Sequence, residues 1–125
     1  MKVIIGIPAY NEENNIGPIV AKLKKKYDHI LVCDDGSNDM TESIASSLGA
    51  IVVKHTTNLG YGAAIKTIFN EARKIDGDVL VTFDADGQHK ISEILICFFE
   101  DLIRISVDIP IPDSVGDISF NTFFE

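Results

Sequence analysis

Two aspartates, Asp84 and Asp86, stand one residue apart in the stretch FDADGQH, which directly follows a short apolar run. Carboxylate oxygens are the ligands that hard divalent cations such as Mg²⁺ and Mn²⁺ prefer, commonly one or two of them together with substrate phosphates. Because the pair flanks Ala85, an extended backbone points the two side chains to opposite sides. A turn at the next glycine could bring one to a metal and leave the other for a sugar or ribose hydroxyl. The stretch therefore indicates a metal and phosphate site, although such a pair alone is more often a solvated turn.

Three more polar or glycine-rich segments follow short apolar runs. They are PAYNEE at residues 8–13, CDDGSND at 33–39 and NLGYG at 58–62. The carboxyl ends of parallel strands share one edge of an open sheet, and ligands bind in the crevice at that edge. We therefore expect these three loops and the loop with the aspartate pair to converge on one cleft.

Each segment also has a purely structural interpretation. The first could be a strand exit followed by an asparagine cap and an acidic first turn of a helix. In the second, Ser37 or Asn38 could cap the next helix, and the glycines of the third could serve only a loop. A turn does not explain why Asp34 and Asp35 stand side by side. Two adjacent acids repel each other unless one meets a donor, such as a nucleobase N–H or a ribose hydroxyl, so this segment favours a nucleotide ligand.

Composition limits the class of protein. A chain of 125 residues with 46% hydrophobic content suits one globular domain with a real core. The formal net charge of −8 and the sequence pI of about 4.7 argue against a partner bound through phosphate neutralisation, so no nucleic acid is expected. A phosphorylated ligand would need local positive charge, from a metal ion or from helix N-termini.

Short apolar runs alternate with amphipathic segments along the chain. This order is typical of βα units and a mainly parallel α/β sheet. Strands are expected at residues 2 to 7, 29 to 34, 50 to 54 and 78 to 83, and helices at 13 to 26, 40 to 48, 62 to 75 and 91 to 104. Gly49 is a suitable end for the second helix. Beyond the fourth helix the pattern weakens, and Pro110 and Pro112 argue against a central strand.

The cysteines and the apolar runs bear on the compartment. Cys33 and Cys97 stand far apart in apolar runs without a CxxC pair, which favours buried free thiols in a reducing compartment. No stretch resembles a signal peptide or reaches the length of about 20 apolar residues that a membrane span needs. We expect a soluble cytoplasmic protein. His29 and His55 match no motif and are interpreted as structural.

The four segments, in this order and at strand ends, resemble the signature set of family-2 glycosyltransferases with the GT-A fold. PAYNEE, CDDGSND, NLGYGAA and FDADGQH are most similar to the branch of polyprenyl-phosphate (dolichol-phosphate) mannosyl- and glucosyltransferases. The resemblance covers roughly residues 2 to 90. It implies a Rossmann-like GT-A sheet and an inverting enzyme that uses a UDP- or GDP-sugar and a divalent metal, Mn²⁺ or Mg²⁺.

The resemblance also implies roles for individual residues. Asp35 would accept a base N–H, and His89, a frequent residue in the family, could equally be a hydrogen-bonding neighbour of the metal shell or a ligand. The metal would stabilise charge on the leaving nucleoside diphosphate while an acceptor oxygen attacks the anomeric carbon. The implied nucleotide-sugar contacts are Pro8, Tyr10, Glu12, Cys33, Asp35, Asp84 and Ala85, and the implied metal ligands are Asp84, Asp86 and Gln88.

The chain departs from the family after its fourth motif. Members continue through strands that carry an acceptor base and basic residues, whereas residues 105–125 match none of those motifs, and no residue is nominated as the catalytic base. We expect residues 1–104 to form the N-terminal part of a nucleotide-sugar-binding GT-A core, followed by an atypical tail. The tail could reflect a truncated gene product, a donor-binding half, or a small protein whose tail forms a sheet edge. A missing half would expose apolar sheet surface and favour self-association.

Other functions are less consistent with the motifs. A dinucleotide-dependent oxidoreductase would carry GxGxxG after the first strand, where this chain has IPAYNEENNIG. A sugar nucleotidyltransferase would need a basic, glycine-rich first loop. A non-catalytic, metal-dependent nucleotide-binding module remains the main alternative. An acceptor polyprenyl phosphate at the cytoplasmic face of the membrane is implied by the resemblance alone.

Overall fold

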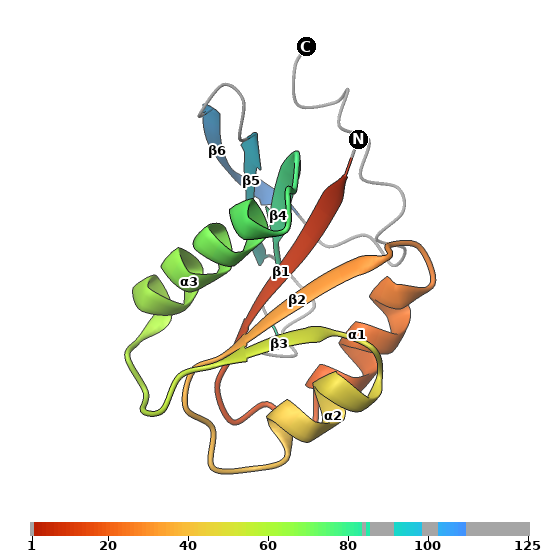
Figure 1. Cartoon of the computed structure of the whole chain (residues 1–125), viewed down its shortest axis with the longest axis vertical. Helices are drawn as coiled ribbons and strands as arrows, with labels where there is room; N and C mark the ends of the chain where they lie inside the picture. Colours follow the sequence, from red (N-terminus) through yellow and green to blue (C-terminus); the bar gives the residue numbers. More distant parts are fainter. Residues whose placement is uncertain (1, 84, 86–91, 99–102, 110–125) are drawn as a thin grey trace.

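The computed structural model describes residues 2–83, 85, 92–98 and 103–109 (Figure 1). The described strands form one sheet in the order β3-β2-β1-β4-β5-β6, in which β1 to β4 are parallel and β5 and β6 are antiparallel. The elements, in chain order, are β1 Val3–Ala9, α1 Ile16–Lys24, β2 His29–Asp34, α2 Thr41–Ser47, β3 Ile51–Lys54, α3 Tyr61–Lys74, β4 Val79–Thr82, β5 Ser92–Phe98 and β6 Ile103–Ile109. The predicted α/β class with a mainly parallel sheet is confirmed.

The apolar runs of β1, β2 and β4 are buried on both faces of the sheet, as is typical of parallel strands, whereas β3 at the end of the strand order is exposed or half-buried. Alternate residues of β1 face opposite sides: Ile5 and Ile7 belong to the core under α1 and α2, whereas Ile4 belongs to the core under α3. Figure 1 shows α3 on one side of the sheet and α1 and α2 on the other. The four expected strands and the first three expected helices are therefore present.

Close packing of α3 fixes the position of β1 in the sheet centre. A Cβ atom at Gly6 would lie 2.4 Å from Cγ2 of Ile68, so α3 approaches the strand backbone directly at this glycine. Gly6 is also the last residue of β1 in register with β4, opposite Thr82. The carboxyl end of β1 therefore extends beyond the end of β4 and is paired there with β2 alone among the described strands.

The end of α2 agrees with the expected bounds, and the start of α1 does not. α2 ends as expected, because Gly49 adopts a φ of 91° and the amides of Gly49 and Ala50 donate to the carbonyls of Ser46 and Ala45, a Schellman motif. α1 begins later than expected, at Ile16. The residues before it form a turn, in which the carbonyl of Glu12 accepts hydrogen bonds from the amides of Asn15 and Ile16.

The expected fourth helix over residues 91 to 104 is wrong. Within this range, residues 92–98 form β5 and residues 103–104 begin β6, and the two strands pair antiparallel with Ser92 opposite Ile109 and Phe98 opposite Ile103. The run ILICFF at 94–99 is continuously apolar and rich in β-branched and aromatic residues, which is typical of a strand and lacks the gaps of an amphipathic helix. The division expected between residues 104 and 105 falls inside β6. That strand ends directly before Pro110 and lies at the end of the strand order, where a proline is tolerated.

Among the described helices, none combines the length and the apolar character that crossing a membrane requires.

Candidate functional site

The loops after the parallel strands meet at one edge of the sheet, toward the bottom of Figure 1. Backbone hydrogen bonds continue past the strand ends: the amide of Asp35 donates to Ala9 O at 2.8 Å, and the amide of His55 donates to Asp34 O at 2.9 Å. The predicted convergence is therefore confirmed for the loops that follow β1, β2 and β3. Most of the loop after β4 lies outside the described residues.

Side chains lock the first loop to the second. The amide of Asn11 donates to Oγ of Ser37 at 2.8 Å, and the amide of Asn38 donates to Oδ1 of Asn11 at 2.9 Å. Asn11 adopts a φ of 50°, a conformation that asparagine tolerates better than most residues. The segment PAYNEE is thus held rigidly against CDDGSND, and Tyr10 is carried on a fixed loop.

The start of α2 differs from the expectation that Ser37 or Asn38 caps it. The helix begins at Thr41, whose amide and hydroxyl donate to Oδ1 of Asp39 at 3.0 and 2.5 Å. The hydroxyl of Thr41 in turn accepts the amide of Glu12 at 2.9 Å. Ser37 is unavailable as a cap because its hydroxyl serves the first loop. Asp39 is the residue that ties helix start and first loop together.

The Asp35 carboxylate accepts three hydrogen bonds from the segment that follows β3 along the sheet edge. Its Oδ1 accepts from Nδ1 of His55 at 2.7 Å and from the amide of Leu59 at 2.9 Å, and its Oδ2 accepts from the amide of Gly60 at 2.9 Å. The carboxylate therefore joins the end of β2 to the end of β3 and to the loop that enters α3. We call Asp35, His55, Leu59 and Gly60 the Asp35 clamp.

Electrostatics hold the clamp carboxylate in its ionised form. Burial raises the pKa of Asp35, but the hydrogen bonds from His55, Leu59 and Gly60 and the charge of His55 outweigh it, so the net pKa lies below the ordinary value. Because an ionised carboxylate only accepts, Nδ1 of His55 carries a proton. The other ring nitrogen, Nε2, lies 2.8 Å from Oγ1 of Thr67 on α3.

The neighbouring Asp34 has a different role. It is fully buried, and its Oδ1 accepts the amide of Ser37 at 3.0 Å, which shapes the turn after β2. Its Oδ2 has no hydrogen-bond partner within the described part of the chain. The two adjacent acids thus divide into one that forms the turn and one that is held by donors from the third loop.

The predicted nucleotide contacts of the first loop differ in exposure. Tyr10 is 44% exposed at the sheet edge, whereas Pro8 is buried in β1 in register with Cys33. Glu12 is half-buried, and its Oε2 accepts from Nδ2 of Asn15 at 2.9 Å. Of these three side chains, Tyr10 is the one exposed to a ligand. The roles of all three remain predictions.

Cys33 lies inside the protein. Its side chain is fully buried in the core under α3, and burial together with the charges of Asp35 and Asp34 raises the pKa of the thiol to about 12. The thiol is free, as expected, and Sγ lies 3.7 Å from Nε2 of His55. A nucleotide contact at this position stays a prediction, and it would have to use the backbone.

The predicted metal site cannot be placed from the described residues. Asp84, Asp86, Gln88 and His89 lie outside them, whereas Ala85 is buried with 2% of its surface exposed. Within the described ranges, no group of three His, Cys, Asp or Glu side chains could hold a metal ion. The donor set of two carboxylates and an amide oxygen suits Mg²⁺ or Mn²⁺ in its chemistry. Those ligand roles stay predictions.

Large apolar side chains are exposed around the same edge. Tyr10 follows β1, Met40 precedes α2, and Leu59 and Tyr61 flank the entry into α3, with exposures of 44%, 56%, 61% and 55%. Leu59 is adjacent to Gly60, whose amide holds Asp35. The edge that carries the clamp thus also offers aromatic and aliphatic surface, which suits the faces of a nucleobase.

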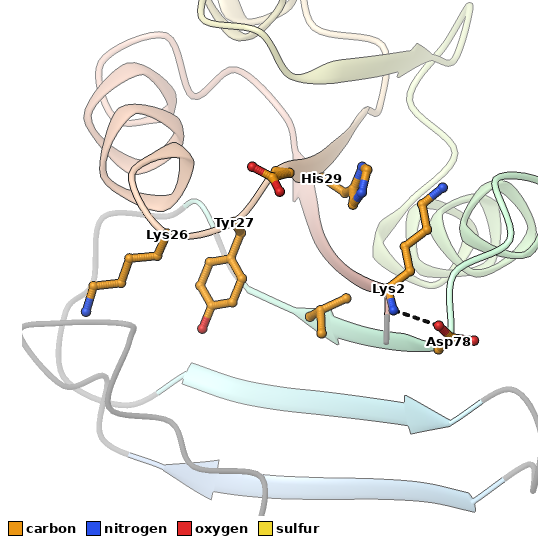
Figure 2. A pocket seen from close by; sticks show the side chains of 7 residues that line it. Lys2, Lys26, Tyr27, His29 and Asp78 are labelled. Atoms are coloured by element: carbon orange, nitrogen blue, oxygen red, sulfur yellow. Dashed lines mark hydrogen bonds between the residues drawn. The ribbon is translucent and has the colours of Figure 1, made fainter.

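A cavity of about 640 Å³ lies at the opposite edge of the sheet, where β1, β2 and β4 begin (Figure 2). The amide of Lys2 donates to Oδ2 of Asp78 at 2.6 Å, and Nζ of Lys2 donates to Ile75 O at 2.6 Å. The residues that line this cavity are Lys2, Val3, Lys26, Tyr27, Asp28, His29 and Asp78. Two lysines and two aspartates balance each other, so this cavity offers no net charge for a diphosphate.

The sheet order and the polar loops at its carboxyl edge define a Rossmann-like α/β protein of the GT-A type. The fold of glucosyl-3-phosphoglycerate synthase from Mycobacterium tuberculosis, solved with Mn²⁺ and UDP, matches 68% of this chain and 33% of that chain, with a TM-score of 0.57 and 29% identity. Mannosyl-3-phosphoglycerate synthase from Rubrobacter xylanophilus matches 69% of this chain and 31% of its own, with a TM-score of 0.60 and 27% identity. The predicted GT-A fold is confirmed.

The family follows from the sequence profile of glycosyl transferase family 2, which matches residues 4–102. The chain belongs to this family of enzymes. The resemblance inferred from the four loops is thereby confirmed.

Curated relatives indicate the branch of the family. The UDP-N-acetylglucosamine–dolichyl-phosphate N-acetylglucosaminyltransferase of Methanococcus voltae is 39% identical over 106 residues, which cover 70% of this chain and 42% of that protein. The dolichol-phosphate mannosyltransferase of Pyrococcus furiosus is 34% identical over 97 residues, covering 71% of this chain and 27% of that protein. The chain therefore spans less than half the length of either relative.

Sequence reasoning missed the role of His55. It was interpreted as structural because it matches no motif, yet it contacts Asp35, Thr67 and Cys33. A signal was available, since His55 directly follows the third strand, at the same position in its βα unit as Asp35 in the second. Equivalent strand-end positions of neighbouring parallel strands lie side by side.

Proposed function

We propose that this chain is the donor-binding portion of an inverting glycosyltransferase, which transfers a sugar from a nucleoside-diphosphate sugar to a polyprenyl phosphate at a membrane surface. Membership of family 2 supports the sugar transfer, and the names of the relatives support the lipid phosphate acceptor. The observation that carries the proposal is the Asp35 clamp, a buried carboxylate that three donors hold in place at the ligand-binding edge of the sheet.

The free acceptor capacity of Asp35 favours uracil over guanine. A carboxylate offers about four lone-pair sites, two on each oxygen. Oδ1 already accepts from His55 and Leu59, and Oδ2 accepts from Gly60, so one acceptor site on Oδ2 is free among the described contacts. The imide edge of uracil presents a single N–H, whereas guanine presents two adjacent donors that need both oxygens. We propose a UDP-sugar as the donor.

A divalent metal completes the proposed donor site. Asp84, Asp86 and Gln88 would hold Mn²⁺ or Mg²⁺, in keeping with the Mn²⁺ and Mg²⁺ found with UDP in similar structures. When bound, the metal would neutralise charge on the leaving diphosphate, which this acidic chain needs. The contribution of the chain itself is to bind and orient the nucleoside: Asp35 would accept the base N–H, and Tyr10 would offer a face for stacking.

Calorimetric titration of the chain with UDP and with GDP, each with and without Mn²⁺, tests the proposal. We expect UDP to bind more tightly than GDP. Asp35→Asn should weaken UDP binding about 10-fold or more, because a charge-assisted hydrogen bond is lost. Asp28→Asn is the matched control, since Asp28 is exposed at the opposite edge of the sheet.

Separate outcomes test the separate parts of the proposal. Equal binding of UDP and GDP would refute the uracil preference and leave nucleotide binding intact. Heat that Mn²⁺ or Asp86→Ala does not change would count against the proposed metal ligands. Absence of binding by either nucleotide would refute the donor site itself.

The alternative is a non-catalytic, metal-dependent nucleotide-binding module, because the Asp35 clamp would serve nucleotide binding with or without sugar transfer. Incubation with a radiolabelled UDP-sugar and polyprenyl phosphate distinguishes the two functions. Transfer to lipid shows a glycosyltransferase, whereas binding without transfer or hydrolysis favours the binding module. A sugar nucleotidyltransferase would instead release pyrophosphate from a nucleoside triphosphate.

A further inference from the structure

We propose that His55 is a positioning residue for the donor site, which fixes the Asp35 carboxylate in the orientation that receives the nucleotide. This inference rests on the proposed function, because it assigns His55 a role at the same site. The imidazole spans two elements: Nδ1 lies 2.7 Å from Oδ1 of Asp35 at the end of β2, and Nε2 lies 2.8 Å from Oγ1 of Thr67 on α3.

Burial makes the ring a rigid connection. The side chains of His55 and Asp35 are 11% and 5% exposed, so water competes little for their hydrogen bond. The ring is anchored from behind by α3, which packs on the sheet through Ile68, the residue after Thr67. A ring held at both nitrogens cannot rotate without losing one of its two bonds.

The contact to His55 decides which carboxylate oxygen remains available. Oδ1 is filled by His55 and Leu59, whereas Oδ2 accepts only from Gly60 among the described residues. Without the imidazole, the carboxylate could rotate about its terminal torsion, which is broad for aspartate. His55 therefore presents Oδ2 to the ligand by occupying Oδ1.

The arrangement tolerates both protonation states of the ring. Nδ1 donates to the carboxylate in either state, and the hydroxyl of Thr67 can donate to Nε2 of a neutral ring or accept from a protonated one. Among the described residues, the acidic groups in contact with the ring are Asp35 and the thiol of Cys33, 3.7 Å from Nε2. A positioning role thus does not depend on a change of charge at His55.

Two substitutions distinguish the hydrogen bond of His55 to Asp35 from its hydrogen bond to Thr67. Asn places its amide near the position of Nδ1 and can still donate to Asp35, whereas Gln reaches toward the position of Nε2 and can contact Thr67 only. His55→Asn is therefore expected to retain nucleotide binding within about 3-fold, and His55→Gln and His55→Ala to weaken it about 10-fold. His29→Ala is the control, because His29 lies at the opposite edge of the sheet.

The decisive measurement is a double-mutant cycle for binding of UDP or GDP, whichever the unmodified chain binds more tightly. If His55 acts through Asp35, His55→Ala should have less than about a 2-fold effect in an Asp35→Asn background. A purely structural histidine would weaken binding by the same factor in both backgrounds, and that result would overturn the inference. Urea unfolding of each variant shows whether it is folded, and the Asn and Gln variants decide if the Ala variant is not.

Hydrogen exchange tests the inference without any nucleotide. The amides of Leu59 and Gly60 donate to the carboxylate that His55 holds, so His55→Ala should lower their protection about 10-fold or more, whereas His55→Asn should preserve it. Unchanged protection in His55→Ala would refute the positioning role even if nucleotides bind. Lowered protection in a chain that binds no nucleotide would support the connection and refute the proposed function instead.

Discussion

At the scale of the residue, the carboxyl edge of the sheet is organised by acids that accept hydrogen bonds from backbone amides. Asp35 accepts from Leu59 and Gly60, Asp34 from Ser37, and Asp39 from Thr41 and Glu13. The bonds to Asp35 and the bond from Glu13 to Asp39 join different loops, whereas those of Ser37 and Thr41 shape the turn after β2 and the start of α2. Negative charge, which the chain carries in excess, thus contributes to the geometry of this edge of the sheet.

Acid should destabilise the fold through Asp35. Its pKa is lowered in the folded state, so the stabilisation is fully present above the ordinary aspartate pKa of about 4 and is lost as the pH falls through the lower, folded-state value. Urea unfolding at pH 7, 4 and 3 should show this loss, with a contribution from Asp35 of up to about 1.4 kcal/mol per pH unit. Asp35→Asn should be less stable at pH 7 and show a shallower decline, and an identical decline would contradict the assignment.

At the scale of the element, the site depends on two loops that approach each other closely. Gly36, in the loop after β2, has a φ of 77°, and a Cβ atom there would lie 2.5 Å from the carbonyl carbon of Thr57 and 2.6 Å from the amide nitrogen of Asn58. Because these neighbouring atoms belong to the backbone, no flexible side chain could move aside to make room for the Cβ atom. The absence of a side chain at Gly36 thus allows the loop after β3 to come close enough for Leu59 and Gly60 to bind Asp35.

Gly36→Ala should therefore destabilise the chain and weaken nucleotide binding. The left-handed conformation alone costs about 1–2 kcal/mol for a residue with a Cβ atom, and the clash adds to this. Gly62→Ala is the matched control, because a Cβ atom at Gly62 in α3 meets nothing within 4 Å, and alanine favours a helix by up to about 1 kcal/mol. Urea unfolding measures both, and similar stability of the two variants would show that the loops do not approach as described.

The strands and helices could be predicted from the sequence where a local pattern of apolar residues and turn motifs distinguishes a strand from a helix. The strands β1 to β4 could be predicted because each is a short apolar run followed by a turn motif, and the clustering of loops followed from parallel pairing. The strands β5 and β6 could not, because a continuous apolar run such as ILICFF fits a buried helix or a strand and only its partner decides. The place of His55 directly after the third strand could be predicted, but its contacts to Asp35 and Thr67 could not, because these residues are distant in sequence.

At the scale of the whole molecule, the described sheet is asymmetric. Its parallel part, β3-β2-β1-β4, carries helices on both faces and the candidate site at its carboxyl edge, whereas β5 and β6 extend it antiparallel beyond β4. The chain spans less than half the length of the relatives described above.

The alkylation rate of the buried Cys33 thiol reports how often this part of the fold opens. A thiol that is fully buried and has a pKa of about 12 reacts with alkylating reagents only when β2 and α3 separate. Because Cys33 lies two residues before Asp35, a bound nucleotide should slow this separation. Alkylation of the Cys33 peptide, followed by mass spectrometry, should fall several-fold in saturating nucleotide, and an unchanged rate would place the ligand elsewhere.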